Sequence, residues 1–259
     1  MSALSIEVHD HVGWFTLNRP GACNAINQEL LMALDKAFIY AKDSRSNIRC
    51  IVLTGAGTHF CGGIDLRSMQ SARTDSQNTQ GIMKRRFVDH LIERLLSLRL
   101  PIVAAVNGAA AGAGMTLALT ADVIVMAEDA YFLPSFLQLG LVPDNGITCL
   151  LSERIGAGRA RAALMLGDRI GAKTAQEWGL AYEVVPPEVL QRKAGEFATR
   201  LASGPPRALA GARALLCHPV ARGFRTQIQA EREACADALV GDEFVEGCAA
   251  FFEHREPKF

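Results

Sequence analysis

The sequence lacks the features that mark several large classes of protein. Its 259 residues contain 27 basic and 27 acidic side chains, so the formal net charge is zero. The excess of basic residues that favours nucleic acid or an anionic membrane as a partner is missing. No apolar run is long enough to cross a bilayer, and the N-terminus has neither the basic region nor the apolar core of a signal peptide. We therefore expect a cytoplasmic protein that binds neither nucleic acid nor a membrane.

Cysteine and histidine at metal-binding spacing are also lacking. The seven cysteines are scattered and include no C-x-x-C pair, which favours reduced thiols over a disulfide framework or a zinc site. Of the six histidines only His9 and His11 are close in sequence, and no third ligand lies near them. The G-x-S-x-G elbow of serine hydrolases is absent as well. These absences predict a protein without a metal site.

Hydrophobic periodicity predicts alternating strands and helices followed by a helical tail. Asn27 is a typical N-cap for a helix that ends near Ala41. The segment 68–80 is polar and is expected to form an exposed loop. From about residue 190 onward the pattern is helical, with breaks expected at Gly204-Pro205-Pro206 and at His218-Pro219. This order predicts an α/β or α+β core with a C-terminal helical region. The expected strands are 5–8, 13–17, 48–54, 102–106, 123–126 and 181–185, and the expected helices are 28–41, 82–98, 147–155, 159–166 and 174–178.

The segment 101–127, PIVAAVNGAAAGAGMTLALTADVIVMA, is the most informative stretch of the chain. A strand of buried type ends at Asn107-Gly108, and a turn of small residues leads into a helix and a second strand. Glycines at 108, 112 and 114 let a ligand approach the backbone and its amide N–H groups. The spacing disfavours phosphate, because it matches neither G-x-G-x-x-G nor a P-loop. Two interpretations stay open at this point: an oxyanion hole, or a turn whose small residues only allow close packing.

A second glycine-rich turn, at Gly62-Gly63, also follows a strand and opens a helix. If the strands before the two turns are neighbours, one backbone N–H from each turn can point at the same carbonyl oxygen. Two converging donors are what an enolate or a tetrahedral anion needs for stabilisation. The pair of turns therefore favours the oxyanion-hole interpretation.

Short motifs follow one another in a distinctive order along nearly the whole chain. They are NRP at 18–20, NAIN at 24–27, IVLTG at 51–55, FCGGIDL at 60–66, PIVAAVNG at 101–108, GAGM at 112–115, LGLVPD at 139–144, WGL at 178–180 and EGCAAFFEHREPKF at 246–259. In this order the chain resembles the crotonase (enoyl-CoA hydratase/isomerase) superfamily. The resemblance implies a core of repeated ββα units in a spiral over residues 1–200, which carries a CoA-thioester site, and a C-terminal helical region over residues 201–259. It also implies an acyl-CoA thioester substrate, no cofactor beyond the CoA of that substrate, and a homotrimer or dimer of trimers built by the C-terminal helices.

The resemblance further implies a set of site residues. The oxyanion-hole amides fall on Ile64 and Ala113. Arg67 falls where members of the family hold a basic residue near the CoA phosphates, and Ala22 lies in the segment that lines the CoA pocket. The residues implied to bind substrate or CoA are Ala22, Cys23, Ala25, Gly62, Gly63, Asp65, Leu66, Arg67, Gly108, Gly112, Phe136 and Leu141.

The chain departs from the hydratases of the family at two acidic positions. Thr116 and Phe136 stand where hydratases carry glutamates, and neither side chain titrates usefully. Asp144 is the carboxylate that remains at a matched position, where isomerases such as the 1,2-epoxyphenylacetyl-CoA and dienoyl-CoA isomerases place an aspartate. One carboxylate can remove a proton and return it elsewhere. We therefore expect an acyl-CoA isomerase that uses Asp144, although this residue also suits a cap for the helix that begins near Gly146.

Other functions stay open. An enoyl-CoA hydratase is the first alternative, and a catalytically weak scaffold that binds CoA thioesters is the second. The 4-chlorobenzoyl-CoA dehalogenases also use an aspartate at the position of Asp144, but the histidine they require is matched by Asp89 rather than His90. His254 stands where hydratases often place a lysine for the CoA 3′-phosphate. A Rossmann dehydrogenase is disfavoured, because no G-x-G-x-x-G follows the first strand.

Overall fold

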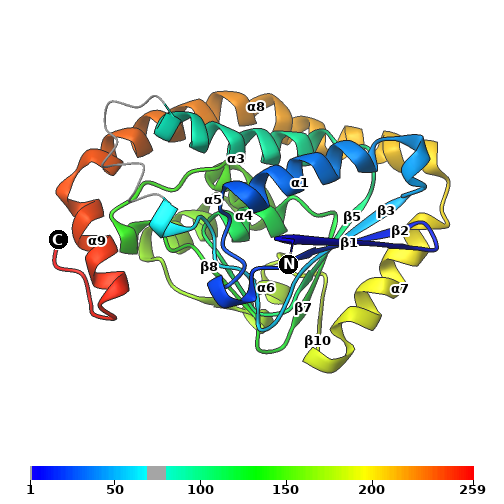
Figure 1. The fold of residues 1–259 in the computed structure, drawn as a ribbon, viewed down its shortest axis with the longest axis horizontal. Helices are drawn as coiled ribbons and strands as arrows, with labels where there is room; N and C mark the ends of the chain where they lie inside the picture. The colour runs from blue at the N-terminus through cyan, green and yellow to red at the C-terminus, as the bar shows by residue number, and fades with distance from the viewer. Residues whose placement is uncertain (1, 69–79) are drawn as a thin grey trace.

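A six-stranded sheet forms the body of the molecule (Figure 1). The computed structural model describes residues 2–68 and 80–259, so the loop expected at 68–80 lies almost wholly outside the described residues. The strand order is β1-β2-β3-β5-β7-β10, in which only β1 and β2 pair antiparallel. The central strands are continuous apolar runs, as expected of parallel strands that are covered on both faces. The bounds are β1 Leu4–His9, β2 Val12–Leu17, β3 Cys50–Gly55, β5 Ile102–Val106, β7 Val123–Ala127 and β10 Glu183–Val185.

A smaller sheet continues three strands of the larger one. The chain passes from β3 to β4, from β5 to β6 and from β7 to β8, so each pair gives one strand to each sheet. A helix follows each pair, namely α3, α4 and α5. This arrangement is the repeated ββα unit that the family resemblance implied. The bounds are β4 His59–Cys61, β6 Ala109–Ala111, β8 Tyr131–Leu133, β9 Ile170–Gly171, α3 Gln80–Ser97, α4 Ala113–Leu119 and α5 Ile147–Leu166.

Helices cover both faces of the large sheet. α1 (Gln28–Ala41), α3 and α8 (Pro206–Val240) run along one side, and α7 (Leu190–Ala202) packs on the other (Figure 1). Asn27 accepts a hydrogen bond from the Leu30 N–H at 2.9 Å, which confirms it as the N-cap of α1. α6 (Ala172–Glu177) precedes β10, and α9 (Asp242–Phe252) lies near the C-terminus. The predicted α/β (α+β) class is confirmed, whereas the division at residue 200 stays a prediction.

Pro219 does not end a helix, so the break expected at His218-Pro219 is wrong. α8 continues through it from Pro206 to Val240. A proline inside a helix costs about 3 kcal/mol, and the contacts of α8 with α3 and α5 offset this cost. By contrast, Gly156 interrupts α5 with non-helical backbone (φ 76°, ψ 154°), in agreement with the two helices expected there.

Two features are not found in the described part of the chain. No helix there combines the length and the apolar composition that a bilayer span requires. Nor does any group of three His, Cys, Asp or Glu residues within residues 2–68 and 80–259 have a placement suited to a metal ion.

Asp122 connects the start of β5 to α8. Its carboxylate accepts hydrogen bonds from the Ile102 N–H at 2.7 Å and from Arg213 Nε at 2.8 Å. The Arg213 side chain is only 3 % exposed, and its guanidinium also donates to the carbonyl oxygens of Leu98 and Thr120. The aspartate is therefore the counter-charge of a buried cation.

We predict that Asp122→Ala lowers the free energy of unfolding by about 3 kcal/mol, because it leaves that cation without its partner. Denaturant unfolding measures the loss. Asp43→Ala is the matched control, because it removes an exposed ion pair with Arg45 and is expected to leave the midpoint unchanged. Equal shifts in the two variants would contradict the prediction.

Candidate active site

The two glycine-rich turns lie side by side, because β4 and β6 are neighbours in the small sheet. Asn107, at the end of β5, is bonded to the connection between β3 and β4: its Oδ1 accepts from the Gly55 N–H at 3.1 Å, and its Nδ2 donates to the Gly57 carbonyl at 2.9 Å. At Gly108 the backbones touch, and a Cβ there would lie 1.9 Å from the Thr58 carbonyl oxygen. The strands that precede the two turns are therefore neighbours, which is the condition for one amide from each turn to reach the same oxygen.

The Ile64 N–H is directed away from the segment that precedes α1. The Gly63 carbonyl accepts a hydrogen bond from the Ile26 N–H at 2.7 Å, and the Gly63–Ile64 peptide is trans. In a trans peptide the C=O and the N–H point in opposite directions. The Ile64 N–H therefore faces the side opposite to Ile26.

The Ala113 N–H is directed out of the start of α4. The Gly112 carbonyl accepts from the Thr116 N–H at 3.1 Å, so this carbonyl points along the helix. By the same geometry of the trans peptide, the Ala113 N–H points the other way. As the first residue of α4, Ala113 has no acceptor within the helix for this N–H.

Gly63 brings these two peptides close together. A Cβ at Gly63 would lie 3.5 Å from the Ala113 nitrogen and 2.8 Å from the Ala111 carbonyl oxygen. Gly63 also has φ +94°, a conformation that favours glycine. The peptides that carry the two N–H groups therefore lie close together, with no side chain on Gly63 to separate them, and their role as an oxyanion hole stays a prediction.

The segment that was predicted to line the CoA pocket lies directly against the first turn. The Gly62 N–H donates to the Cys23 carbonyl at 2.8 Å, and Ile26 forms a parallel bridge with Ile64. The Asp65 carboxylate lies 3.1 Å from the guanidinium of Arg19. Residues 22–26 and 62–65 therefore pack against each other through backbone hydrogen bonds.

Asn24 holds this segment in place, a role that the sequence did not reveal. Its side chain is fully buried, donates to the carbonyl oxygens of Ala56 and His59 at 2.9 and 2.7 Å, and accepts from the Arg19 N–H at 2.8 Å. Its backbone is left-handed (φ 54°), which asparagine tolerates better than most residues. The only sequence signal was its place in the NAIN motif.

The residues predicted to bind substrate or CoA differ widely in exposure, and their roles stay predictions. Cys23 and Arg67 are exposed, Ala22, Ala25, Gly62, Asp65 and Leu66 are half-buried, and Gly63, Gly108, Gly112, Phe136 and Leu141 are buried.

The two positions that lack a glutamate are both inside the protein. Thr116 lies fully buried in α4, and its hydroxyl donates to the Gly112 carbonyl at 3.4 Å. Phe136 is 6 % exposed and packs in the hydrophobic core. Neither side chain supplies an acid or a base.

Asp144 ends the loop before α5 and is half-buried. Its carboxylate accepts a hydrogen bond from the Asn145 side chain, and its carbonyl accepts one from the Ile147 N–H at 3.3 Å. Asn145 and Gly146 are both left-handed (φ 60° and 80°), so the chain turns sharply from Asp144 into the helix.

Glu231, on α8, is the acidic residue that sequence reasoning missed. Its Oε2 accepts from the Gly146 N–H at 2.6 Å, and its Oε1 accepts from the Thr148 N–H at 3.3 Å and from the Thr148 hydroxyl. The start of α5 is thus capped from another helix. The carboxyl is 3 % exposed, and its burial above all raises its pKa to about 7, with a further contribution from the charge of Asp144.

A sequence signal for Glu231 did exist. The buried stripe of α8 contains Phe224, Ile228, Glu231 and Cys235, each no more than 3 % exposed. This spacing is that of one helix face. An acidic residue on an apolar stripe is a buried charge, and buried carboxyls with shifted pKa values are common at functional sites.

An open cavity of about 220 Å³ lies beside the Asp144 loop. Leu141 and Val142 line it from that loop, Ala238 from α8 and Glu243 from α9. Gly140 packs so closely against α9 that a Cβ there would lie 2.6 Å from the Glu243 backbone. The C-terminal helices therefore shape the space beside residues 137–142.

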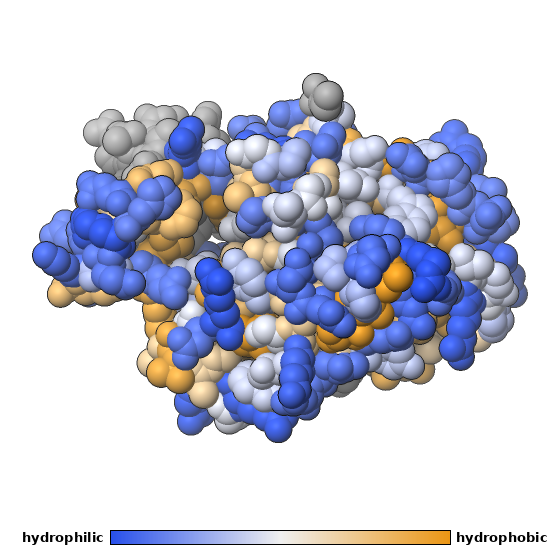
Figure 2. Space-filling model, turned by 90° about the horizontal axis from the view of Figure 1, so that it is seen from below, coloured by the Kyte–Doolittle hydropathy of each residue, from blue (hydrophilic) through white to orange (hydrophobic). Residues whose placement is uncertain are grey.

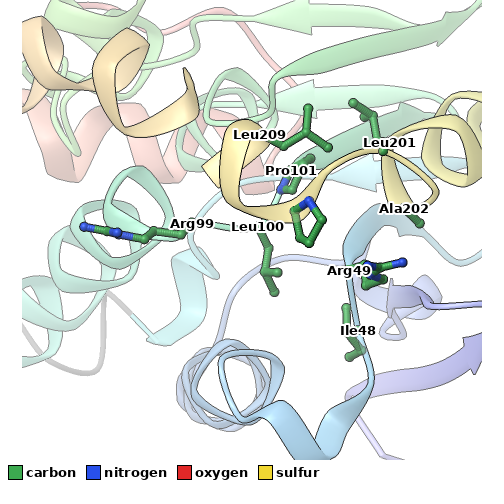
Figure 3. Close-up of a pocket in the computed structure, with 10 residues that line it drawn as sticks. Ile48, Arg49, Arg99, Leu100, Pro101, Leu201, Ala202 and Leu209 are labelled. Atoms are coloured by element: carbon green, nitrogen blue, oxygen red, sulfur yellow. The ribbon is translucent and has the colours of Figure 1, made fainter. Parts of the chain in front are cut away.

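A second cavity, of about 110 Å³, lies where the central strands β3 and β5 begin (Figure 3). Ile48 and Arg49 line it just before β3, and Pro101 just before β5, whereas β4 and β6, which lead to Gly63 and Gly112, follow the other ends of these strands. Arg99 points away from Pro101 and Leu209 (Figure 3). This cavity is separate from the candidate active site.

The histidines singled out in the sequence lie apart from these groups. His90 is exposed, with its Nδ1 3.7 Å from the Glu93 carboxylate. Its neighbour Asp89 is buried and forms an ion pair with Arg232. His254 is exposed after α9.

A model of the enoyl-CoA hydratase/isomerase family matches residues 7–259. The chain belongs to the enoyl-CoA hydratase/isomerase family. It is 36 % identical to the 1,2-epoxyphenylacetyl-CoA isomerase of Escherichia coli strain K12, over 100 % of this chain and 98 % of the relative. It is 35 % identical to a probable enoyl-CoA hydratase of Rhodobacter capsulatus, over 98 % of this chain and 96 % of the relative. The crystal structure of an enoyl-CoA hydratase from Mycobacterium avium subsp. paratuberculosis K-10 superposes with a TM-score of 0.89 at 28 % identity, covering 100 % of this chain and 99 % of that one.

These findings confirm the crotonase resemblance, the fold class and the assignment to the hydratase/isomerase enzymes. The names of the relatives do not decide the reaction, because one is an isomerase and another a probable hydratase. The distinction therefore depends on the side chains of the site.

Proposed function

We propose that this family member is an acyl-CoA isomerase that moves a proton with a single aspartate, Asp144. The observation that carries the proposal is the combination of two adjacent backbone donors, Ile64 and Ala113, with non-titrating residues at both hydratase acid positions. The donors suit the oxygen of a thioester carbonyl. The proton-transfer group at a matched position is then Asp144 alone.

The reaction follows from this arrangement. Hydrogen bonds from the Ile64 and Ala113 amides to the thioester oxygen stabilise the enolate that forms when a neighbouring C–H loses its proton. The Asp144 carboxylate accepts that proton. The double bond shifts as the electron pair returns from the enolate, and Asp144 delivers the proton to a different carbon. No water is consumed, and no cofactor beyond the CoA of the substrate is needed.

An enoyl-CoA hydratase is the second candidate, favoured by the 35 % identical relative from Rhodobacter capsulatus. Hydration needs one group to activate water and a proton source at the other carbon. In this chain Thr116 and Phe136 supply neither, which places hydration behind isomerisation.

Incubation with unsaturated acyl-CoAs in D₂O tests the proposal. The expected products carry deuterium and a shifted double bond, without the added mass of water, and mass spectrometry with NMR detects both changes. A panel of aliphatic and aromatic acyl groups identifies the preferred substrate. Predominant hydration would overturn the isomerase in favour of the second candidate. Binding of CoA thioesters without exchange on any substrate would favour a scaffold.

We also propose that α9 joins copies of the chain, as the trimer or dimer of trimers expected from the family. Val245, Phe251 and Phe252 on this helix are exposed, and the two phenylalanine rings stack edge to face with centroids 5.5 Å apart. Exposed hydrophobic residues also occur on other elements, such as Leu215 and Leu216 of α8, and the face drawn in Figure 2 shows hydrophobic areas among hydrophilic ones. Exposed aromatic side chains on a terminal helix are typical of an interface between subunits.

A further inference from the structure

We infer that Glu231 is a positioning residue for the proton transfer at Asp144, an inference that rests on the proposed function. Glu231 lies on α8, 85 residues along the chain from Gly146, yet its carboxylate accepts the Gly146 N–H at 2.6 Å. It also accepts both the N–H and the hydroxyl of Thr148. These three bonds fix the start of α5 and with it the left-handed turn at Asn145 and Gly146, which orients Asp144.

The second consequence of this geometry is electrostatic. Two acidic groups, Asp144 and Glu231, lie at the same turn, and the charge of Asp144 opposes the ionisation of Glu231. The ionised carboxylate accepts the Gly146 and Thr148 N–H groups in charge-assisted hydrogen bonds, which are stronger than those to a neutral carboxyl. Ionised Glu231 therefore holds the turn that orients Asp144 more firmly than protonated Glu231 does.

Other titratable groups lie on α8 and on the helices packed against it. On its own helix, Arg232 is paired with Asp89 of α3. From α5, the Cys149 thiol has a raised pKa, owing to burial first and then to the charges of Glu153 and Glu231. On α9, Glu246 is bound by Arg255. Since burial raises the pKa of Glu231 to about 7, its charge changes within the working range of most enzymes.

A carboxylate also suits a purely structural cap, because a negative charge is favourable at a helix N-terminus. A cap affects folding and leaves the pH dependence of the chemical step unchanged. A positioning residue coupled to Asp144 alters that pH dependence, which gives the experiment its readout.

The test is the pH profile of kcat for the whole protein with its best acyl-CoA substrate. The wild-type kcat is expected to rise several-fold as pH increases through about 7, because Glu231 then gains the charge that strengthens its bonds to the start of α5. Glu231→Gln is expected to lack this rise and to have a kcat several-fold lower at pH 8, with KM within about twofold of wild type. A wild-type profile in Glu231→Gln would overturn the inference.

Thr148→Val provides a second variant in case Glu231→Gln does not fold. It removes the hydroxyl that lowers the pKa of Glu231 but keeps the carboxyl, so the rise in kcat is expected to move to higher pH. An unmoved rise would count against Glu231. Glu233→Gln is the matched control: it makes the same charge change at an exposed position of α8, where Gln229 is the partner, and should keep the wild-type profile.

Asp144→Asn separates this inference from the proposed function. If Asp144→Asn is inactive while Glu231→Gln keeps the wild-type profile, the inference about Glu231 fails and the proposed mechanism stands. If Asp144→Asn keeps its activity, the proposed mechanism fails, and the inference fails with it.

Discussion

Asp144→Asn is expected to lower kcat roughly a thousandfold, within the range that a positioned general base contributes. An amide does not accept the proton of a C–H bond, and the residues at the two hydratase acid positions, Thr116 and Phe136, offer no substitute. KM for the acyl-CoA should change little, because the residues predicted to bind the CoA portion and the thioester oxygen are unchanged. Deuterium incorporation from D₂O into the substrate should fall together with kcat.

The substitution is well suited to the structure around it. The Asn145 side chain donates to the Asp144 side chain, and the oxygen of an asparagine can accept the same hydrogen bond. The turn into α5 is therefore expected to persist, which unchanged thermal unfolding should verify. Asp129→Asn, at an exposed position after β7, is the matched control and should keep full activity. Activity in Asp144→Asn within tenfold of wild type would remove this residue from the mechanism.

The long elements of the fold were predictable because each carries its own pattern. β3 and β5 are unbroken apolar runs, and α1 has an Asn27 cap before a clear apolar face. The small sheet was not predicted. β4, β6 and β8 each contain three residues, too few for a period-two pattern, and Ala109–Ala111 has no β-branched side chain. These strands form because neighbouring ββα units place them side by side.

The residues of the candidate site likewise divide into those with a local sequence pattern and those without one. The two turns and Asp144 were identified from local motifs, and the pairing of β4 with β6 then brought the turns together. Asn24 and Glu231 act through contacts with residues far along the chain, such as the bond from Gly146 to Glu231. No local pattern describes such a contact. In α8 the signal was indirect, an acidic residue on the buried face of a helix, and its partner is known only from the fold.

Gly63→Ala is expected to lower kcat by roughly a hundredfold to a thousandfold, the range found when one oxyanion-hole donor is removed. An alanine at φ +94° is strained, and its Cβ would lie 2.8 Å from the Ala111 carbonyl oxygen, so the backbone has to move. The peptide that moves is the one that carries the Ile64 N–H. Because the proposed role of this donor is to stabilise the enolate, kcat should fall more than KM rises.

Steady-state kinetics and thermal unfolding of the same preparation separate catalysis from stability in Gly63→Ala. Gly211→Ala, at an exposed position of α8 where a Cβ meets nothing within 4 Å, is the control and should keep wild-type kcat. If Gly63→Ala loses only stability and keeps its kcat, the Ile64 amide does not hold the substrate oxygen, and the glycine serves close packing alone. If kcat falls in a variant that still folds, the glycine is required because it lets the Ile64 and Ala113 amides meet at one oxygen. The two interpretations of a glycine-rich turn, close packing and oxyanion binding, then describe the same contact.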